Sequence, residues 1–215
     1  MNLINPERFS DEVYQALKAA FSGIRASNSD QSFYTFALFT DDSLQFLHPA
    51  ANTEEGLAAT VRRYKETVDP EYGGTSTQAG MRWSYGDWKF FPDVGGGHFD
   101  EINRTLASQF DWRIKSQIGE EESMQQIQLL WGAALSAFRR LDLEGFFATG
   151  TSREGLTLMF VGHLPEEVFN HCLSRLNPPV VVERFLTGTT KLQTVVRGFR
   201  MRSMAIETNK EGALR

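Results

Sequence analysis

The sequence has little of several features that define particular classes of protein. Cys172 is the only cysteine among 215 residues, so an internal disulfide framework and a zinc site built from several thiolates are both excluded. No apolar run approaches the roughly 20 residues that a membrane helix needs. Residues 1–14 contain no basic region followed by a continuous apolar stretch, so a secretory signal is not expected. We therefore expect a cytoplasmic protein that does not enter a membrane.

Motifs of catalytic and cofactor chemistry are also lacking. The triplet Gly95–Gly97 is not followed by Lys-Ser or Lys-Thr, and no G-x-G-x-x-G pattern surrounds it, so nucleotide binding is not expected. His98 and His163 could approach carboxylates such as Asp93, but no metal-ligand spacing supports such a site. His171 and Cys172 are neighbours on one expected helix and point about 100° apart, which does not suit a nucleophile and its base. The sequence predicts no catalytic residue, no metal site and no cofactor.

Charge is distributed unevenly along the chain. The formal net charge is -5, which argues against a nucleic-acid-binding protein that works by neutralising phosphates. Residues 191–215 carry six basic and two acidic side chains, a net charge of +4, and the preceding 190 residues therefore carry -9. The basic extension either folds back on the acidic body, frays in solvent, or contacts RNA or a membrane surface. An acidic body suits a basic protein partner.

Periodicity predicts an α+β protein with a small, mainly antiparallel sheet covered by several helices, of which two form a central antiparallel pair. A single domain is expected over residues 1–190, followed by the basic extension 191–215, which is expected to be partly disordered. The expected helices cover residues 10–26, 53–68, 98–118, 120–147 and 164–176. The expected strands cover residues 32–42, 43–49, 154–163 and 180–185. Residues 69–80 are expected to form a loop.

The densest aromatic segment covers residues 81–101 and contains Trp83 and Trp88. One interpretation places Trp83 in the core and Trp88 in a groove between sheet and helix, because tryptophan buries a large area. The other treats the segment as a binding surface, since Trp, Tyr and Arg are enriched at interface hot spots. Sequence does not separate these two interpretations. The candidate binding residues are Arg82, Trp83, Trp88, Asp93 and His98.

Five motifs, in the order and at about the separations found here, resemble a bacterial family called domain of unknown function 4303. They are FYTFALFTDD, TEEGL, MRWSYGDWKF, LDLEGFF and SRLNPP, and together they span roughly residues 8–180. The most specific is the pattern formed by Arg82, Trp83 and Trp88. The resemblance implies a compact cytoplasmic bacterial domain, supplies no catalytic residues, and is compatible with a toxin-neutralising role.

Two functions therefore stay open. The first is a non-enzymatic protein-binding module, immunity-like or an adaptor, that grips a basic partner through an acidic face and exposed aromatic side chains. The alternative is a small-molecule-binding protein or small hydrolase with a pocket near Trp83 and Trp88. A pocket that holds His98 and a carboxylate within hydrogen-bond reach would favour catalysis, and a solvent-exposed His98 would count against it. The oligomeric state is not indicated by the sequence.

Overall fold

The fold was analysed in a computed structural model, which describes residues 3–70, 74–91, 96–116 and 119–189. The predicted extension 191–215 lies outside these residues. The elements, in chain order, are α1 (Pro6–Ala26), β1 (Phe33–Asp41), β2 (His48–Thr53), α2 (Glu54–Thr67), α3 (Thr75–Trp83), the short 3-10 helix η1 (Tyr85–Asp87), α4 (Asp100–Lys115), α5 (Glu120–Leu143), α6 (Gly150–Glu154), β3 (Thr157–His163), α7 (Glu166–Leu176) and a last helix over residues 179–189.

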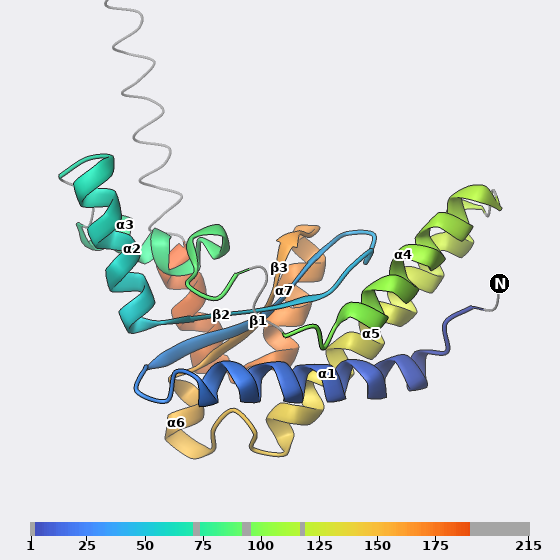
Figure 1. Ribbon diagram of the computed structural model, residues 1–215, viewed down its shortest axis with the longest axis horizontal. Helices are drawn as coiled ribbons and strands as arrows, with labels where there is room; N and C mark the ends of the chain where they lie inside the picture. Colours follow the sequence, from blue (N-terminus) through green and yellow to red (C-terminus); the bar gives the residue numbers. More distant parts are fainter. Residues whose placement is uncertain (1–2, 71–73, 92–95, 117–118, 190–215) are drawn as a thin grey trace, which may run out of the picture.

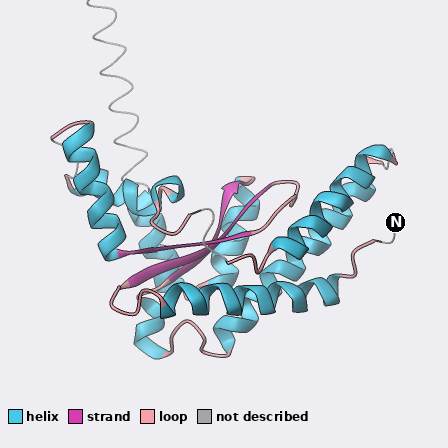
Figure 2. Ribbon diagram, viewed as in Figure 1, coloured by secondary structure: helices cyan, strands magenta, loops and turns pink. Residues whose placement is uncertain are grey.

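The three strands form one sheet in the order β2-β1-β3, so the first strand lies in the centre (Figures 1 and 2). β1 is antiparallel to β2 and parallel to β3, and Leu38 faces Pro49 on one neighbour and Phe160 on the other. The predicted α+β class is confirmed, but the sheet is mixed rather than mainly antiparallel. A parallel neighbour needs a long crossover connection, and here the chain passes through α2 to α6 before it returns in β3.

One face of the sheet is covered by α1 and α5, and this layer contains most of the apolar core (Figure 1). Phe21 of α1 packs edge-on against Phe36 of β1, with ring centroids 4.8 Å apart. Phe138 of α5 packs against Phe160 of β3 at 6.0 Å. These four phenylalanines are almost completely buried, so they account for much of the apolar area that the fold removes from water.

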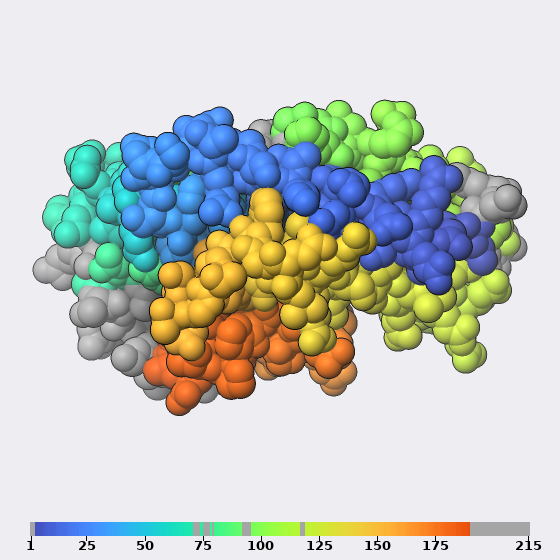
Figure 3. All heavy atoms as spheres, turned by 90° about the horizontal axis from the view of Figure 1, so that it is seen from below, coloured from blue at the N-terminus to red at the C-terminus, as the bar shows by residue number. Residues whose placement is uncertain are grey.

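The opposite face of the sheet packs against the aromatic segment and the C-terminal helices. Ala37 of β1 and Met159 of β3 belong to a second cluster together with Trp88, Leu173 of α7 and Phe185 of the last helix. This layer is smaller than the first. Figure 3 shows the first layer from outside, where α1, in dark blue, lies beside the yellow segment that connects α5 to β3.

α4 and α5 run in opposite directions, as predicted for the helical pair, and α4 with the start of α5 extends away from the sheet (Figure 1). Leu106 of α4 and Leu130 of α5 are buried in the same cluster. The end of the aromatic segment 81–101 leads directly into α4. The pair is therefore continuous with the main core rather than a separate unit.

Three predictions of local structure were wrong. The strand expected over residues 43–49 was misplaced: the chain turns after β1, and the strand that pairs with β1 is β2, which begins at His48. Residues 75–83 form α3, where a loop was expected from the glycines and hydroxyls. The expected strand 180–185 is part of the helix 179–189: Pro179 stands at the first helical position, and Val181 and Phe185, four residues apart, are both buried.

Candidate ligand-binding cavity

The aromatic segment is held in place by hydrogen bonds to the backbone carbonyl oxygen of Arg82, the next-to-last residue of α3. The indole Nε1–H of Trp88 donates to this oxygen at 3.0 Å, and the hydroxyl of Tyr34 donates to it at 2.8 Å. A carbonyl oxygen has two lone pairs, so both bonds can form at once. One bond therefore joins Trp88 to the start of the aromatic segment, and the other joins the segment to β1.

A second anchor of this segment is the side chain of Asp87. Its carboxylate accepts hydrogen bonds from Tyr64 at 2.8 Å and Arg63 at 3.1 Å, both from α2. It also accepts one from the hydroxyl of Ser84 at 2.9 Å. Trp88 follows directly and is 4 % exposed. The structure therefore places Trp88 in the core, while Trp83 is only partly buried.

Arg82 is the first charged residue of the candidate site, and its side chain is paired. Its guanidinium donates to both carboxylate oxygens of Glu54, at 2.9 and 2.6 Å, in the fork geometry that arginine and carboxylate share. It also lies over the ring of Tyr34, 4.3 Å from the centroid. Burial raises the pKa of the Tyr34 hydroxyl, and the positive charge of Arg82 lowers it in part.

Arg82 and Trp83 line a cavity of about 350 Å³, which we call the end cavity because it lies at one end of the sheet. Tyr34 stands near the start of β1, Thr157 is the first residue of β3, and Glu54 directly follows β2. These positions meet because β1 and β3 are parallel and β2 is antiparallel to them. The residues that line the end cavity are Tyr34, Glu54, Arg82, Trp83, Gly155, Thr157, Arg184 and Gly188.

The hydroxyl of Thr157 lacks a hydrogen-bond partner in the described part of the chain, although the residue is 0 % exposed. Thr35, its partner in the β1–β3 register, also has a buried hydroxyl without a partner among the described residues. Most buried polar atoms in proteins form hydrogen bonds, and leaving one unpaired costs roughly 1–3 kcal/mol. Neither hydroxyl has accessible surface, so both lie behind the cavity wall rather than in it.

Arg184, from the last helix, forms the opposite side of the end cavity. It donates to the backbone oxygen of Glu154 at 2.7 Å and makes no ion pair within the residues that the structure describes. Partial burial lowers the pKa of Arg184, and repulsion from Arg82 and Arg153 lowers it further, against a smaller opposite effect of Glu154. The cavity therefore contains a guanidinium without a carboxylate partner.

Arg153 fixes the chain just before the cavity residues of β3. It is 7 % exposed and pairs with Asp142 at 2.5 Å. Its other nitrogen atoms donate to the backbone oxygens of Leu156 at 2.5 Å and Leu176 at 2.8 Å. One buried guanidinium thus joins the end of α5, the start of β3 and the end of α7. This network holds Thr157 and the last helix at a defined separation.

A comparison with protein-family models finds one match, to the family described as Domain of unknown function (DUF4303), over residues 13–178. The chain belongs to the DUF4303 family. No curated protein and no solved structure is similar to it by the same kind of comparison. The match ends before Arg184 and Gly188, so the family region contributes one side of the end cavity and the last helix contributes the other.

The structure brings together two of the five candidate residues of this DUF4303 protein. Arg82 and Trp83 line the end cavity, whereas Trp88 supports it from the core. His98 is exposed just before α4 and is not among the residues that line a described cavity. Asp93 lies outside the described residues.

Sequence reasoning missed the cavity residues Tyr34, Thr157 and Arg184. Tyr34 and Thr157 stand in expected strands, where an aromatic or β-branched residue is ordinary. Arg184 was assigned to a strand that does not form. One signal was available in the sequence: Val181 and Phe185 are apolar and four positions apart, which is a helical spacing. Both are buried in the structure, and this spacing could have indicated that Arg184 belongs to a helix packed near the sheet.

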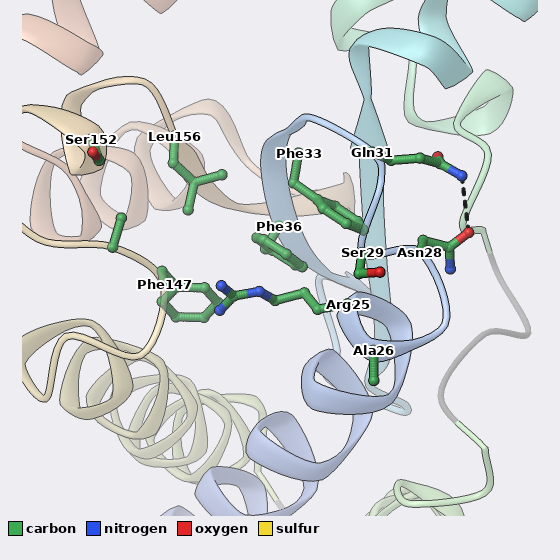
Figure 4. Close-up of a pocket in the computed structure, with 11 residues that line it drawn as sticks. Arg25, Ala26, Asn28, Ser29, Gln31, Phe33, Phe36, Phe147, Ser152 and Leu156 are labelled. Atoms are coloured by element: carbon green, nitrogen blue, oxygen red, sulfur yellow. Dashed lines mark hydrogen bonds between the residues drawn. The ribbon is translucent and has the colours of Figure 1, made fainter.

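A second cavity of the DUF4303 protein, of about 480 Å³, lies between the end of α1 and the segment around α6 (Figure 4). Phe33, Phe36 and Phe147 form its apolar side, and Arg25 extends into it. The guanidinium of Arg25 already donates to the backbone oxygen of Phe146 at 2.7 Å. Gln31 donates to Asn28 at 3.0 Å across the rim. Arg25 thus has one backbone partner and no ion pair among the described residues, as Arg184 has in the end cavity.

The remaining candidates for chemistry do not form a constellation. No group of three or more His, Cys, Asp or Glu side chains that could hold a metal ion occurs in residues 3–70, 74–91, 96–116 and 119–189. Burial raises the pKa of the Cys172 thiol to about 12, so the reactive thiolate is disfavoured. Within the same ranges, no helix is both long and apolar enough to cross a membrane.

Proposed function

We propose that this DUF4303 protein is a non-enzymatic binding protein that holds a small molecule in the end cavity. The observation that carries the proposal is the guanidinium of Arg184, which lines the end cavity and has no ion-pair partner among the described residues. A bound molecule that pairs with this guanidinium would be stabilised by a charge-assisted hydrogen bond.

The dimensions and construction of the end cavity support this proposal. Its volume of about 350 Å³ falls near the lower limit of ordinary ligand sites, which are roughly 300–1,000 Å³. The lining residues stand on strands and helices that the networks of Arg153 and Asp87 hold in place. A cavity built on such elements needs little rearrangement to receive a ligand, which favours affinity.

Binding is favoured over catalysis by the state of the ionisable groups. Glu54 is the only carboxylate among the lining residues, and both its oxygens accept hydrogen bonds from Arg82. His98, the histidine that a hydrolase would have required, faces solvent. We further propose that the protein acts in the bacterial cytoplasm, where a single buried thiol such as Cys172 stays reduced.

A protein partner is a second candidate. The support is the net charge of -9 over residues 1–190, which would attract a basic protein electrostatically. Because Trp88 is buried, such a partner would contact Arg82 and the exposed part of Trp83 rather than both tryptophans. Capture of a specific basic protein by the wild type, lost in an Arg82→Ala variant that folds, would favour this candidate over the small molecule.

The proposed function is tested by a thermal stability screen against small water-soluble metabolites. Gly188→Leu serves to fill the end cavity, since a side chain there meets only Trp83 Nε1, at 3.4 Å from the added Cβ. Gly132→Leu is the matched control, because Gly132 is an exposed helical glycine with nothing near its added Cβ.

A ligand at ten times its Kd adds about 1.4 kcal/mol to the free energy of unfolding, which raises the Tm by about 3–6 °C in a chain of this size. We expect at least one compound to stabilise the wild type and the Gly132→Leu variant but not the Gly188→Leu variant. The proposal fails if no compound stabilises the wild type at millimolar concentration, or if Gly188→Leu responds as the wild type does.

A further inference from the structure

We propose that the ligand of the end cavity carries an oxyanion, a carboxylate or a phosphate group, bound by Trp83 and Arg184. This inference rests on the proposed function and specifies the chemistry of the ligand. It depends on an inventory of the hydrogen-bond donors and acceptors that line the cavity.

Two side chains of the end cavity have donors that are not in use, and both lie next to Gly188, which follows Arg184 by four residues in the last helix. The Nε1–H of Trp83 has no hydrogen-bond partner among the described residues, and its position 3.4 Å from a Cβ built at Gly188 places it at the cavity wall. Arg184 donates a hydrogen bond from Nη1 to the backbone oxygen of Glu154, and its Nε and Nη2 make no hydrogen bond to any described residue.

The side-chain acceptors of the same cavity are partly engaged. Each oxygen of Glu54 accepts one hydrogen bond from Arg82. The hydroxyl of Tyr34 accepts from Asn52 at 2.9 Å and donates its own hydrogen to the backbone of Arg82. The donors without a partner belong to Trp83 and Arg184, and a ligand that supplies an acceptor to each of them matches this arrangement, which favours oxyanions.

The charges near the cavity lead to the same conclusion. The guanidinium of Arg82 is paired with Glu54 and that of Arg153 with Asp142, so two of the three arginines are neutralised. Arg184 has only the exposed Glu154 as a neighbouring acid, and that carboxylate is not within ion-pair distance. An anion beside Arg184 would replace the missing partner, and hydrogen bonds between charged groups are stronger than neutral ones.

The aromatic wall restricts the rest of the ligand. Trp83 packs edge-on against Phe185, with ring centroids 4.8 Å apart, and against Tyr34 at 5.8 Å. Its partly exposed ring therefore presents a fixed apolar surface next to the donors. A flat organic acid can place its ring along Trp83 and its anionic group beside Arg184, within a volume too small for a long chain.

The test uses three probes: benzoate, its neutral analogue benzamide, which has nearly the same shape, and inorganic phosphate. Binding to the full chain is measured by calorimetry and by the indole N–H signals of the four tryptophans in NMR spectra, with Trp83 assigned through a Trp83→Phe variant. The binding variants are Arg184→Gln and Trp83→Phe, and the matched control is Arg139→Gln, an exposed arginine of α5 away from the cavity.

We expect benzoate to bind at least about tenfold more tightly than benzamide and to shift the Trp83 indole signal. Arg184→Gln should weaken benzoate binding about tenfold and Trp83→Phe about threefold or more, while Arg139→Gln should change it less than about twofold. Phosphate that competes with benzoate would show that the anionic group alone is recognised.

Equal binding of benzoate and benzamide at Trp83 would overturn the oxyanion and leave the small-molecule function standing. An absence of binding by both benzoate and phosphate at millimolar concentration would also overturn the oxyanion, and the metabolite screen would then decide the proposed function separately. Binding that Arg184→Gln leaves unchanged while Arg139→Gln weakens it would show that the anion is held elsewhere.

Discussion

The indole N–H of Trp88 donates to the backbone carbonyl of Arg82, six residues earlier, at 3.0 Å. A buried core residue and a residue of the cavity wall are therefore coupled directly. The same carbonyl accepts the hydroxyl of Tyr34, so Arg82 is held by its backbone on one side and by Glu54 on the other. The position of the Arg82 and Trp83 side chains thus depends on how the core is packed behind them.

Replacement of Trp88 by phenylalanine is expected to lower the free energy of unfolding by about 2 kcal/mol, from one lost hydrogen bond and a small cavity. Arg82 keeps its bond from Tyr34, so the carbonyl is not left unpaired. Urea unfolding measures the change. Trp112→Phe is the control, because Trp112 is only half-buried on α4 and should lose clearly less. Equal losses for the two variants would contradict the role assigned to Trp88.

Arg153→Met is expected to lower the free energy of unfolding by about 3–5 kcal/mol, because it leaves the carboxylate of Asp142 and two backbone oxygens without their buried partner. Adding Asp142→Leu should recover a substantial part of that free energy, since the unpaired charge is then removed as well. Arg104→Met, at an exposed pair with Glu101, should cost much less. If the double variant is no more stable than Arg153→Met, the buried pair is not the source of the effect.

Thr157→Val is expected to leave the stability of the ligand-free protein within about 1 kcal/mol of the wild type, because the hydroxyl that it removes makes no hydrogen bond. The two side chains have nearly the same shape, so packing is preserved. Chemical denaturation without added ligand is the measurement. A loss above about 2 kcal/mol would mean that the Thr157 hydroxyl has an internal hydrogen-bond partner, which would contradict the unpaired state described above.

Cys172 is expected to make stability fall at high pH. Burial raises the pKa of its thiol to about 12, whereas the unfolded thiol ionises near pH 8.5. Between these values the unfolded state has lost a proton that the folded state retains, so stability decreases as the pH rises, by up to about 1.4 kcal/mol per pH unit. Urea unfolding at about pH 8 and pH 10 should show a larger loss for the wild type than for Cys172→Ala. Equal losses of stability in both proteins would show that Cys172 is not the source of the pH dependence.

The elements that sequence predicted best are those whose signals are local. Thr53 caps α2 through its side chain, which accepts the N–H of Gly56, and the acids that follow mark the helix start. The α4–α5 pair and α7 follow from apolar positions three or four apart and from Asn177, where the helix ends before a proline. Cap residues and helical stripes are properties of a few neighbouring positions, so they can be recognised without knowledge of the tertiary contacts.

The rest depended on contacts between distant segments. The parallel pairing of β1 with β3 joins residues more than 100 positions apart, such as Thr35 and Thr157, and no local pattern records it. The helix 179–189 was mistaken for a strand because three valines favour β structure, and packing of Val181 and Phe185 prevailed over that propensity. Because of these two errors, the sequence did not show that the start of β3 and the last helix line the end cavity. Of the residues that line it, only Arg82 and Trp83 had been predicted as candidate binding residues.

The measurement that tests the account most directly is the NMR signal of the Trp83 indole N–H in the presence of compounds that stabilise the protein. This group lies in the wall of the end cavity and has no hydrogen-bond partner among the described residues. We predict that such compounds shift the Trp83 signal while the signal of Trp88, whose N–H is bonded to Arg82, moves little. Stabilising compounds that leave Trp83 unchanged and instead perturb residues around Arg25 and Phe147 would place the site in the second cavity and contradict the account.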